Sequence, residues 1–240
     1  MASIDVRYTG VLFIDFQHDV CARGGRMVSQ SEEVIAGFEA VRARAGWLLE
    51  QLRDLPQGKP HYAFVAHGFE SGYPELVGGR LSPFETYVIQ SAAFERGTAG
   101  TAQVPELIPT ADEHVFWKQT LSPFESSNLG YWLNKRGVDT LAIAGVVAHY
   151  AVLATALAAF DRGFRVLVVE DCCASSSRER HDMALEILEP LCELVTAEDL
   201  QARLYDASGK HLKASRSASG APGAVGFGGE GAPGSAASRR

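Results

Sequence analysis

Three positions in the sequence place a chemically active group directly after an apolar run that predicts a buried strand. Asp15 follows the run 11–14, and Lys118 follows the run 114–117. The run 141–144 leads into a glycine and a helix-forming stretch, 145–156. Ligands of parallel sheets bind beyond the carboxyl ends of the strands. We therefore expect the carboxylate, the ammonium and the strand-to-helix corner to lie at one edge of the sheet.

Each of these groups has a structural and a chemical interpretation. A carboxylate in the position of Asp15 either caps the following turn or acts as an acid or base. Lys118 either extends its amine to water along an apolar surface or pairs with a carboxylate, because burying an unpaired ammonium is costly. As a pair, the two groups would shift each other's pKa values. At the corner, unpaired backbone N–H groups of a helix start can stabilise developing negative charge.

The order of the predicted elements indicates the fold class. Strands are expected at 11–14, 62–66, 114–117, 140–144, 165–169 and 191–195, and helices at 31–52, 127–137, 145–162, 178–188 and 197–204. This alternation predicts an α/β fold with three layers, namely a doubly wound, mostly parallel six-stranded sheet between helices. The segment 67–109 is too long for a plain connector, and such loops usually carry function.

Composition and charge restrict the class of protein. The length of 240 residues fits one α/β domain, residues 1–205, followed by a Gly/Ala/Ser-rich tail, residues 206–240, that is expected to be disordered. The formal net charge of -7 argues against nucleic-acid and anionic-membrane partners. No apolar run reaches the roughly 18 residues of a membrane span, and no signal peptide is recognisable. Four cysteines without a CxxC pair fit a reduced cytoplasmic protein.

Several segments together resemble one known family. They run from Val11 to about Leu204 and comprise 12–17 with Gly24 and Gly25, 104–107, 118–124, 137–141, 145–156, 159–166 and 169–175. The chain is similar in these segments to the isochorismatase-like superfamily, also called the cysteine hydrolases. That group includes nicotinamidases, N-carbamoylsarcosine amidases and true isochorismatases. The match is specific for the fold and the superfamily, and it says little about the substrate.

The resemblance implies roles for individual residues. Asp15 corresponds to the acid/base of the family and Lys118 to its partner lysine, and the Val146–Val147 bond corresponds to a non-proline cis peptide. The implied substrate-binding residues are Gln17, His67, Val147, Ala148 and Ala151. The resemblance also implies a small-molecule substrate and a homo-oligomer. No cofactor is expected, and no metal site either, because His67 lacks the preceding Asp-x of the nicotinamidase motif.

One departure from the family pattern decides which hypotheses remain. The amidase members carry threonine and a nucleophilic cysteine where this chain has Ala148 and Ala151, and a methyl group cannot be a nucleophile. True isochorismatases also lack the cysteine, and Ala148-His149 resembles their version, although His149 can equally be a satisfied histidine at a helix start.

Three hypotheses follow from this departure. The first is a cysteine-independent hydrolase of a small carboxylated or vinyl-ether-like molecule. The second is a silent member that binds a metabolite or a protein, and the third is an amidase in which Asp15 activates water. Cys21, Cys172 and Cys173 are expected to serve packing rather than to replace the missing thiol.

Overall fold

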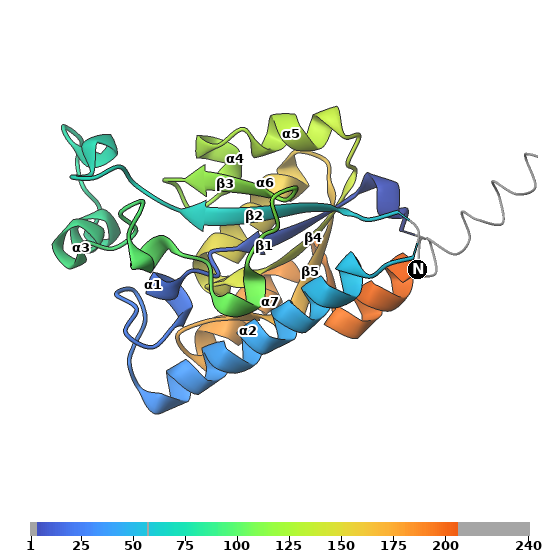
Figure 1. The fold of residues 1–240 in the computed structure, drawn as a ribbon, viewed down its shortest axis with the longest axis horizontal. Helices are drawn as coiled ribbons and strands as arrows, with labels where there is room; N and C mark the ends of the chain where they lie inside the picture. The colour runs from blue at the N-terminus through green and yellow to red at the C-terminus, as the bar shows by residue number, and fades with distance from the viewer. Residues whose placement is uncertain (1–3, 57, 206–240) are drawn as a thin grey trace, which may run out of the picture.

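A six-stranded sheet forms the centre of the computed structural model, which describes residues 4–56 and 58–205 (Figure 1). The strand order is β3-β2-β1-β4-β5-β6, and every neighbouring pair is parallel. The strands are β1 (Thr9–Ile14), β2 (His61–His67), β3 (His114–Lys118), β4 (Thr140–Val146), β5 (Arg165–Ala174) and β6 (Glu193–Val195). The order reverses between β1 and β4, and this switch point is where open α/β sheets bind ligands.

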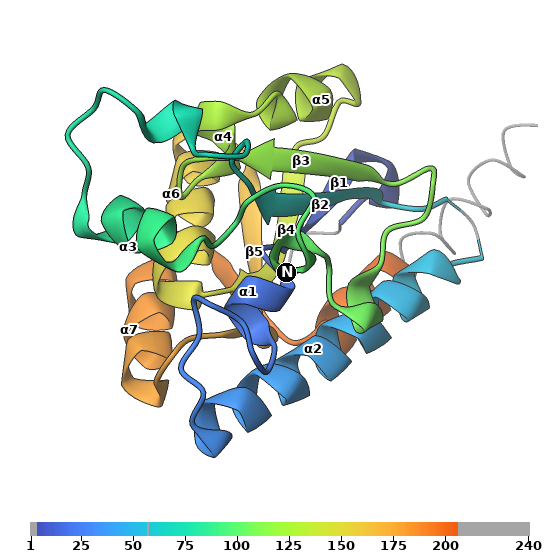
Figure 2. The same cartoon turned by 60° about the vertical axis from the view of Figure 1, so that its left-hand side comes forward.

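Helices cover both faces of the sheet, as expected for strands that are apolar on both sides (Figure 2). The helices are α1 (His18–Cys21), α2 (Glu32–Arg53), α3 (Pro83–Ser91), α4 (Pro123–Ser126), α5 (Leu129–Lys135), α6 (Leu153–Asp161) and α7 (Arg178–Leu188). Helix α2 and a last helical segment, 197–205, pack on one face, whereas α5, α6 and α7 pack on the other. The predicted three-layer, doubly wound fold is confirmed, and the sheet is entirely parallel.

The predicted elements differ from the observed ones mainly in their ends and in the long segment 67–109. Strand β5 continues to Ala174, five residues beyond the expected end, because Cys173 and Ala174 resume pairing with β4 after a register shift. Helix α3 was not predicted. Its capping box, in which the Ser82 hydroxyl accepts from the Glu85 backbone N–H while the Glu85 carboxylate accepts from the Ser82 backbone, is a local start signal. The expected tail, 206–240, lies outside the described residues.

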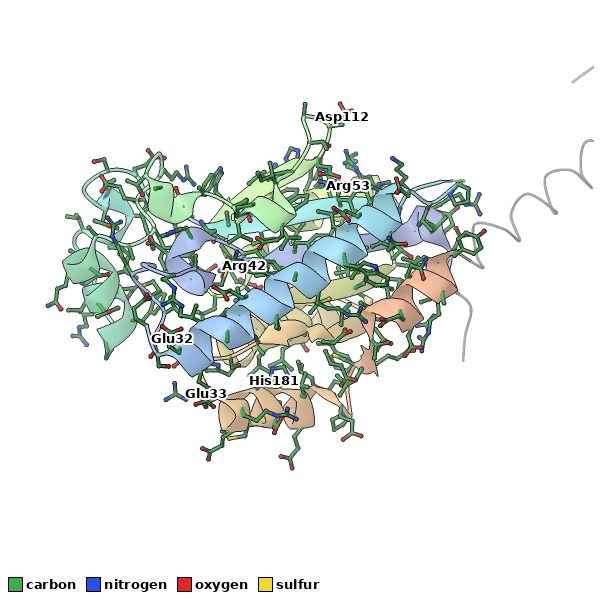
Figure 3. All side chains as sticks on the ribbon, turned by 60° about the horizontal axis from the view of Figure 1, so that its bottom comes forward. Glu32, Glu33, Arg42, Arg53, Asp112 and His181 are labelled. Carbon is green, nitrogen blue, oxygen red and sulfur yellow. The ribbon has the colours of Figure 1, made fainter. Side chains whose placement is uncertain are left out.

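Ion pairs hold the segment before β3 against α2. Arg42 bonds to Glu106 with an N···O distance of 2.7 Å, and Arg53 bonds to Glu113 at 2.5 Å. Both arginines lie on α2, as Figure 3 shows. This arrangement leaves the earlier part of the segment, which contains α3, beyond the carboxyl ends of the strands (Figures 1 and 2). In the part of the chain that the structure describes, no helix is both long and apolar enough to span a bilayer.

Candidate active site

Asp15 and Lys118 form a buried ion pair at the carboxyl ends of β1 and β3. The Lys118 Nζ lies 2.8 Å from Asp15 Oδ2, and the two side chains are 1% and 8% exposed. Nζ also bonds to His67 Nδ1 at 3.0 Å and donates to the Thr120 carbonyl at 3.2 Å. Three partners therefore satisfy the three hydrogens of the ammonium. The expected proximity of Asp15 and Lys118 is present, and His67 joins the pair from the end of β2.

The second carboxylate oxygen of Asp15 has no such partner. Asp15 Oδ1 is buried and accepts no hydrogen bond from any residue in 4–56 and 58–205. Burial raises the pKa of this carboxyl above its usual value, although the nearby Lys118 charge and hydrogen bond act in the opposite direction. The residue has a φ of 55°, a left-handed conformation that aspartate tolerates better than most residues. Asp15 is thus a buried proton acceptor or donor with one oxygen available.

His67 is a neutral hydrogen-bond donor in this site. Burial, and secondarily the Lys118 charge, holds the pKa of its imidazole well below 6.5. Because Lys118 is an ammonium, His67 Nδ1 must accept and the ring proton must lie on Nε2. Nε2 is buried and has no partner among the described residues, and the ring packs against Phe69, Phe84 and Phe94.

Gln17 occupies a different position from the substrate contact that the resemblance implied. Its side-chain amide donates to the carbonyls of His67 and Thr101 at 2.9 and 3.1 Å, and its carbonyl accepts from the His67 N–H at 2.8 Å. The side chain is fully buried. Through these bonds the Gln17 side chain holds the backbone at the end of β2. It therefore positions His67 and does not line the cavity.

The corner after β4 begins with the expected cis bond between Val146 and Val147. A π-helical turn, Ala148–Val152, follows and continues into α6. Ala148 and Ala151 are both buried, and Ala151 contacts the cavity whereas Ala148 packs in the core. A methyl group at 151 leaves space at the corner and offers no nucleophilic atom.

A cavity of about 340 Å³ joins the strand ends to the corner. Of the residues predicted to form the site, Asp15, Lys118, His67, Val147 and Ala151 line it together, whereas Gln17 and Ala148 do not appear among the described lining residues. The other lining residues are Val20, Met27, Phe84, Tyr87, Phe94, Leu121, Val146, His149, Tyr150, Ser176 and Arg180. The volume suits a small molecule, and most of the wall is apolar or aromatic.

Two of the lining residues outside the predicted set, His149 and Arg180, bring nitrogen-containing side chains to the cavity. The His149 Nδ1 bonds to Ser175 Oγ at 2.9 Å, and an Arg180 Nη1 donates to Ser176 Oγ at 3.1 Å. Arg180 is exposed, and no ion pair joins it to any described residue. The sequence did offer a way to find His149, because Ala148-His149 resembles the motif of true isochorismatases. Nothing in the sequence distinguished Arg180 from Arg178, which instead pairs with Asp182.

The described residues that line this cavity include no cysteine and no cluster of metal ligands. All four cysteines are free and buried, and burial raises the pKa of the Cys21 thiol to about 12. Within the described residues, no group of three or more His, Cys, Asp or Glu side chains is arranged to hold a metal ion. The chemical resources of the site are therefore a buried carboxyl, an ammonium, two imidazoles and a guanidinium, which can move protons and bind an anion.

Comparisons with known proteins identify the family of the chain. The Isochorismatase domain model matches residues 9–199. Maleamate amidohydrolase from Pseudomonas putida is 32% identical over 208 residues, which cover 85% of this chain and 90% of that protein. The Isochorismatase of Bacillus subtilis is 36% identical over 96 residues, which are 40% of this chain and 31% of that longer protein.

Solved structures show the same fold. A cysteine hydrolase from Pseudomonas syringae pv. phaseolicola superposes with a TM-score of 0.75 at 19% identity, and the match covers 86% of this chain and 97% of that one. An isochorismatase family protein from Desulfovibrio vulgaris gives a TM-score of 0.71 at 22% identity, covering 82% and 98%. The domain match covers most of the chain, and the fold agrees with it. The protein belongs to the isochorismatase family, whose relatives include hydrolases of small metabolites.

Proposed function

We propose that this protein is a hydrolase that cleaves a small carboxylated metabolite without a cysteine nucleophile. Asp15 transfers the proton, and Lys118 holds and orients the Asp15 carboxyl. One observation carries the proposal: a buried aspartate in the cavity has one oxygen bound to an ammonium and the other unpartnered among the described residues. Buried polar groups normally find partners, so an unsatisfied oxygen in a cavity wall favours a bound reactant.

The environment of Asp15 favours proton donation. Because burial raises its pKa, a larger fraction of the carboxyl is protonated near neutral pH than for an exposed aspartate. A protonated carboxyl can protonate the carbon of an enol ether, after which water attacks the cation. A direct attack on an amide would need a nucleophile at 151, and Ala151 has none. Enol-ether cleavage is therefore the favoured reaction type, and water-driven amide hydrolysis is the second candidate because of the maleamate amidohydrolase relative.

The charges of the cavity support a carboxylated substrate. An ionised Asp15 balances the charge of Lys118, a protonated Asp15 leaves that charge unbalanced, and Arg180 adds one positive charge at the rim in either case. Guanidinium groups bind carboxylates through paired hydrogen bonds. We propose that a substrate carboxylate binds Arg180 while the scissile bond lies near Asp15.

The proposal also includes a reducing compartment and self-association. Four buried free cysteines are typical of cytoplasmic proteins, where thiols stay reduced. Tyr87, Leu121 and Tyr150 are large apolar side chains that line the cavity and are 51%, 41% and 50% exposed. A second copy of the chain would cover this surface.

A substrate panel with one variant tests the function. Purified protein is assayed with isochorismate as an enol ether and with maleamate as an amide, each followed by chromatography of the products. We expect turnover of one of them, reduced about 10²–10⁴-fold in Asp15→Asn. Exposed Asp112→Asn provides the matched control and should retain activity. Inactivity of the wild type on both compounds, with tight binding of either, would favour a silent binding protein instead.

A further inference from the structure

We propose that His149 is a second proton-transfer residue of this site and acts as the base that deprotonates the attacking water. The inference rests on the hydrolytic function proposed above and adds a residue to it. His149 lies in the turn after β4, next to the strand that delivers Asp15, because β1 and β4 pair side by side. Both side chains line the same cavity. Hydrolysis by water needs a group that takes a proton from the nucleophile as well as one that gives a proton to the substrate.

The contacts of His149 fix which ring nitrogen is available. Its Nδ1 bonds to Ser175 Oγ at 2.9 Å, and its ring lies 4.3 Å from the Tyr150 ring between centroids. A base whose second nitrogen is held by another group is the usual arrangement of an oriented catalytic imidazole. We assign the proton to Nδ1, which donates to Ser175, so that the lone pair of Nε2 is free. Two residues further on, the small Ala151 leaves room for a water molecule at the corner.

The surrounding charges keep this imidazole unprotonated. Burial lowers the pKa of His149 below 6.5, and the positive charge of Arg180 on α7 lowers it further. The other charged groups that line the cavity are Asp15 and Lys118, which form an ion pair from β1 and β3. Ser175, directly after β5, and Tyr150, in the same turn as His149, contribute hydroxyl groups. His149 is thus the unprotonated form that a base requires.

The other imidazole of the cavity cannot take this role. His67 Nδ1 receives a hydrogen from Lys118, so its remaining nitrogen carries a proton and has no lone pair to offer. Protonating His67 would also place a cation against the Lys118 ammonium. His67, at the strand ends, is therefore a hydrogen-bond donor to the cavity, whereas His149, at the corner, is a proton acceptor.

The enol-ether reaction balances with these two residues. Asp15 gives its proton to the terminal carbon, which leaves an oxocarbenium ion and the Asp15 carboxylate. Water adds to the cationic carbon, and His149 Nε2 takes one water proton, so a hemiketal and an imidazolium form. The bond to the leaving oxygen then breaks, and the imidazolium proton goes to that oxygen. The hemiketal hydroxyl proton returns to Asp15, and the products are an alcohol and a ketone.

The pH dependence of kcat/KM for isochorismate tests the proposal. In the wild type, activity should fall at acid pH as His149 becomes protonated. In His149→Gln we expect a loss of about 10²–10⁴-fold at neutral pH together with disappearance of that acid limb. Added imidazole should restore part of the activity of His149→Ala. The matched control is His181→Gln, because His181 is also half-buried but does not line this cavity. It lies in a second groove between α2 and the start of α7, on the side of Glu33 (Figure 3).

The outcomes separate this inference from the function on which it rests. A wild type that turns over neither substrate overturns the hydrolytic function, and the role of His149 with it. An active wild type whose rate and acid limb survive in His149→Gln overturns only the role of His149. Nitrogen-15 NMR of the free protein adds a readout that needs no substrate: a proton on Nδ1 of His149 is expected, and a proton on Nε2 at neutral pH would contradict the proposal.

Discussion

The two sides of the cavity differ in how they expose their polar groups. On the strand side, the side chains of Asp15 and Lys118 are 8% and 1% exposed, and His67 is also buried. On the helix side, His149 is half-buried and Arg180 is exposed. Burial shifts the pKa values of Asp15 and His67 on the strand side and that of His149 on the helix side. The helix side differs in that Arg180 presents a positive charge that incoming anions can reach. The buried proton donor and the anion-binding cation thus come from different parts of the fold.

Among the substitutions that test this difference, we expect the largest effect on the strand side, at Lys118. Lys118→Met removes one member of a buried ion pair and leaves Asp15 without compensation. We expect the free energy of unfolding at neutral pH to fall by about 3–5 kcal/mol, and the rate of hydrolysis to fall by about 10²–10⁴-fold. Urea unfolding monitored by circular dichroism, together with steady-state kinetics, measures both effects. A stability loss below about 1 kcal/mol would show that the pair is not buried as described.

The same variant has a defined pH dependence. Loss of the ammonium raises the pKa of Asp15 further, since Lys118 is the group that lowers it. A raised pKa in the folded state means that stability is present below the unfolded pKa, about 3.9, and is lost as pH rises through the folded value. The deficit of Lys118→Met should therefore grow from acid to neutral pH. In the pH profile of kcat/KM, activity falls at alkaline pH as Asp15 loses its proton, and this fall should move to higher pH in the variant.

On the helix side, Arg180→Gln should have a smaller and more selective effect. We expect KM for a carboxylated substrate to rise about tenfold, which corresponds to about 1.4 kcal/mol, with little change in kcat. The free energy of unfolding should stay within about 0.5 kcal/mol of the wild type because the residue is exposed. Loss of the cation should also raise the pKa of His149 and move the acid limb to higher pH.

Arg178→Gln is the matched control for Arg180, because Arg178 lies in the same first turn of α7 and pairs with Asp182. Kinetics at two ionic strengths give a further check, since an exposed charge is screened by salt. An equal rise of KM in both variants would indicate a general charge effect and not a specific carboxylate contact.

The smallest effect is expected at the corner that separates the two sides. In Ala151→Cys the added sulfur enters the cavity, so the melting temperature should change by only a few degrees. The introduced thiol should react with iodoacetamide faster than the native cysteines, whose burial raises their pKa, to about 11 for Cys192. We expect detectable cleavage of maleamate by this variant. An unreactive thiol would show that position 151 does not face the cavity.

The sequence was sufficient for the parts of the fold that apolar runs control. Runs bounded by Asp15 and Lys118 placed both residues at the same sheet edge, and the alternation of strands and helices indicated the parallel order. The register shift in β4–β5 was not predictable, because Glu170 and Asp171 interrupt the apolar pattern within β5. Helix α3 was missed inside a segment rich in Gly and Pro, although Ser82 and Glu85 gave a capping signal.

The candidate site was predictable where a residue stands at or directly after a strand end, as Asp15 and Lys118 do, and where the family resemblance covered the corner, as at Val147 and Ala151. Gln17 also lies close to the end of β1, but its side chain does not line the cavity. Its amide donates to the carbonyl of Thr101, which lies far along the chain, so local sequence could not predict its orientation. Arg180 enters the cavity through the orientation of α7, which local sequence does not encode. The roles of all these residues stay predictions until the variants above are measured.

Gly145 restricts which changes the active site can tolerate. A Cβ at this position would lie 2.7 Å from the Ile14 Cβ and 2.9 Å from the Ile14 carbonyl oxygen, so even alanine would force β4 away from β1. The backbone just before Asp15 and the backbone just before the corner are therefore spaced by direct contact. New substrates can be accommodated by changing the loops around the cavity, while the separation between the reacting groups stays constant from one variant to the next.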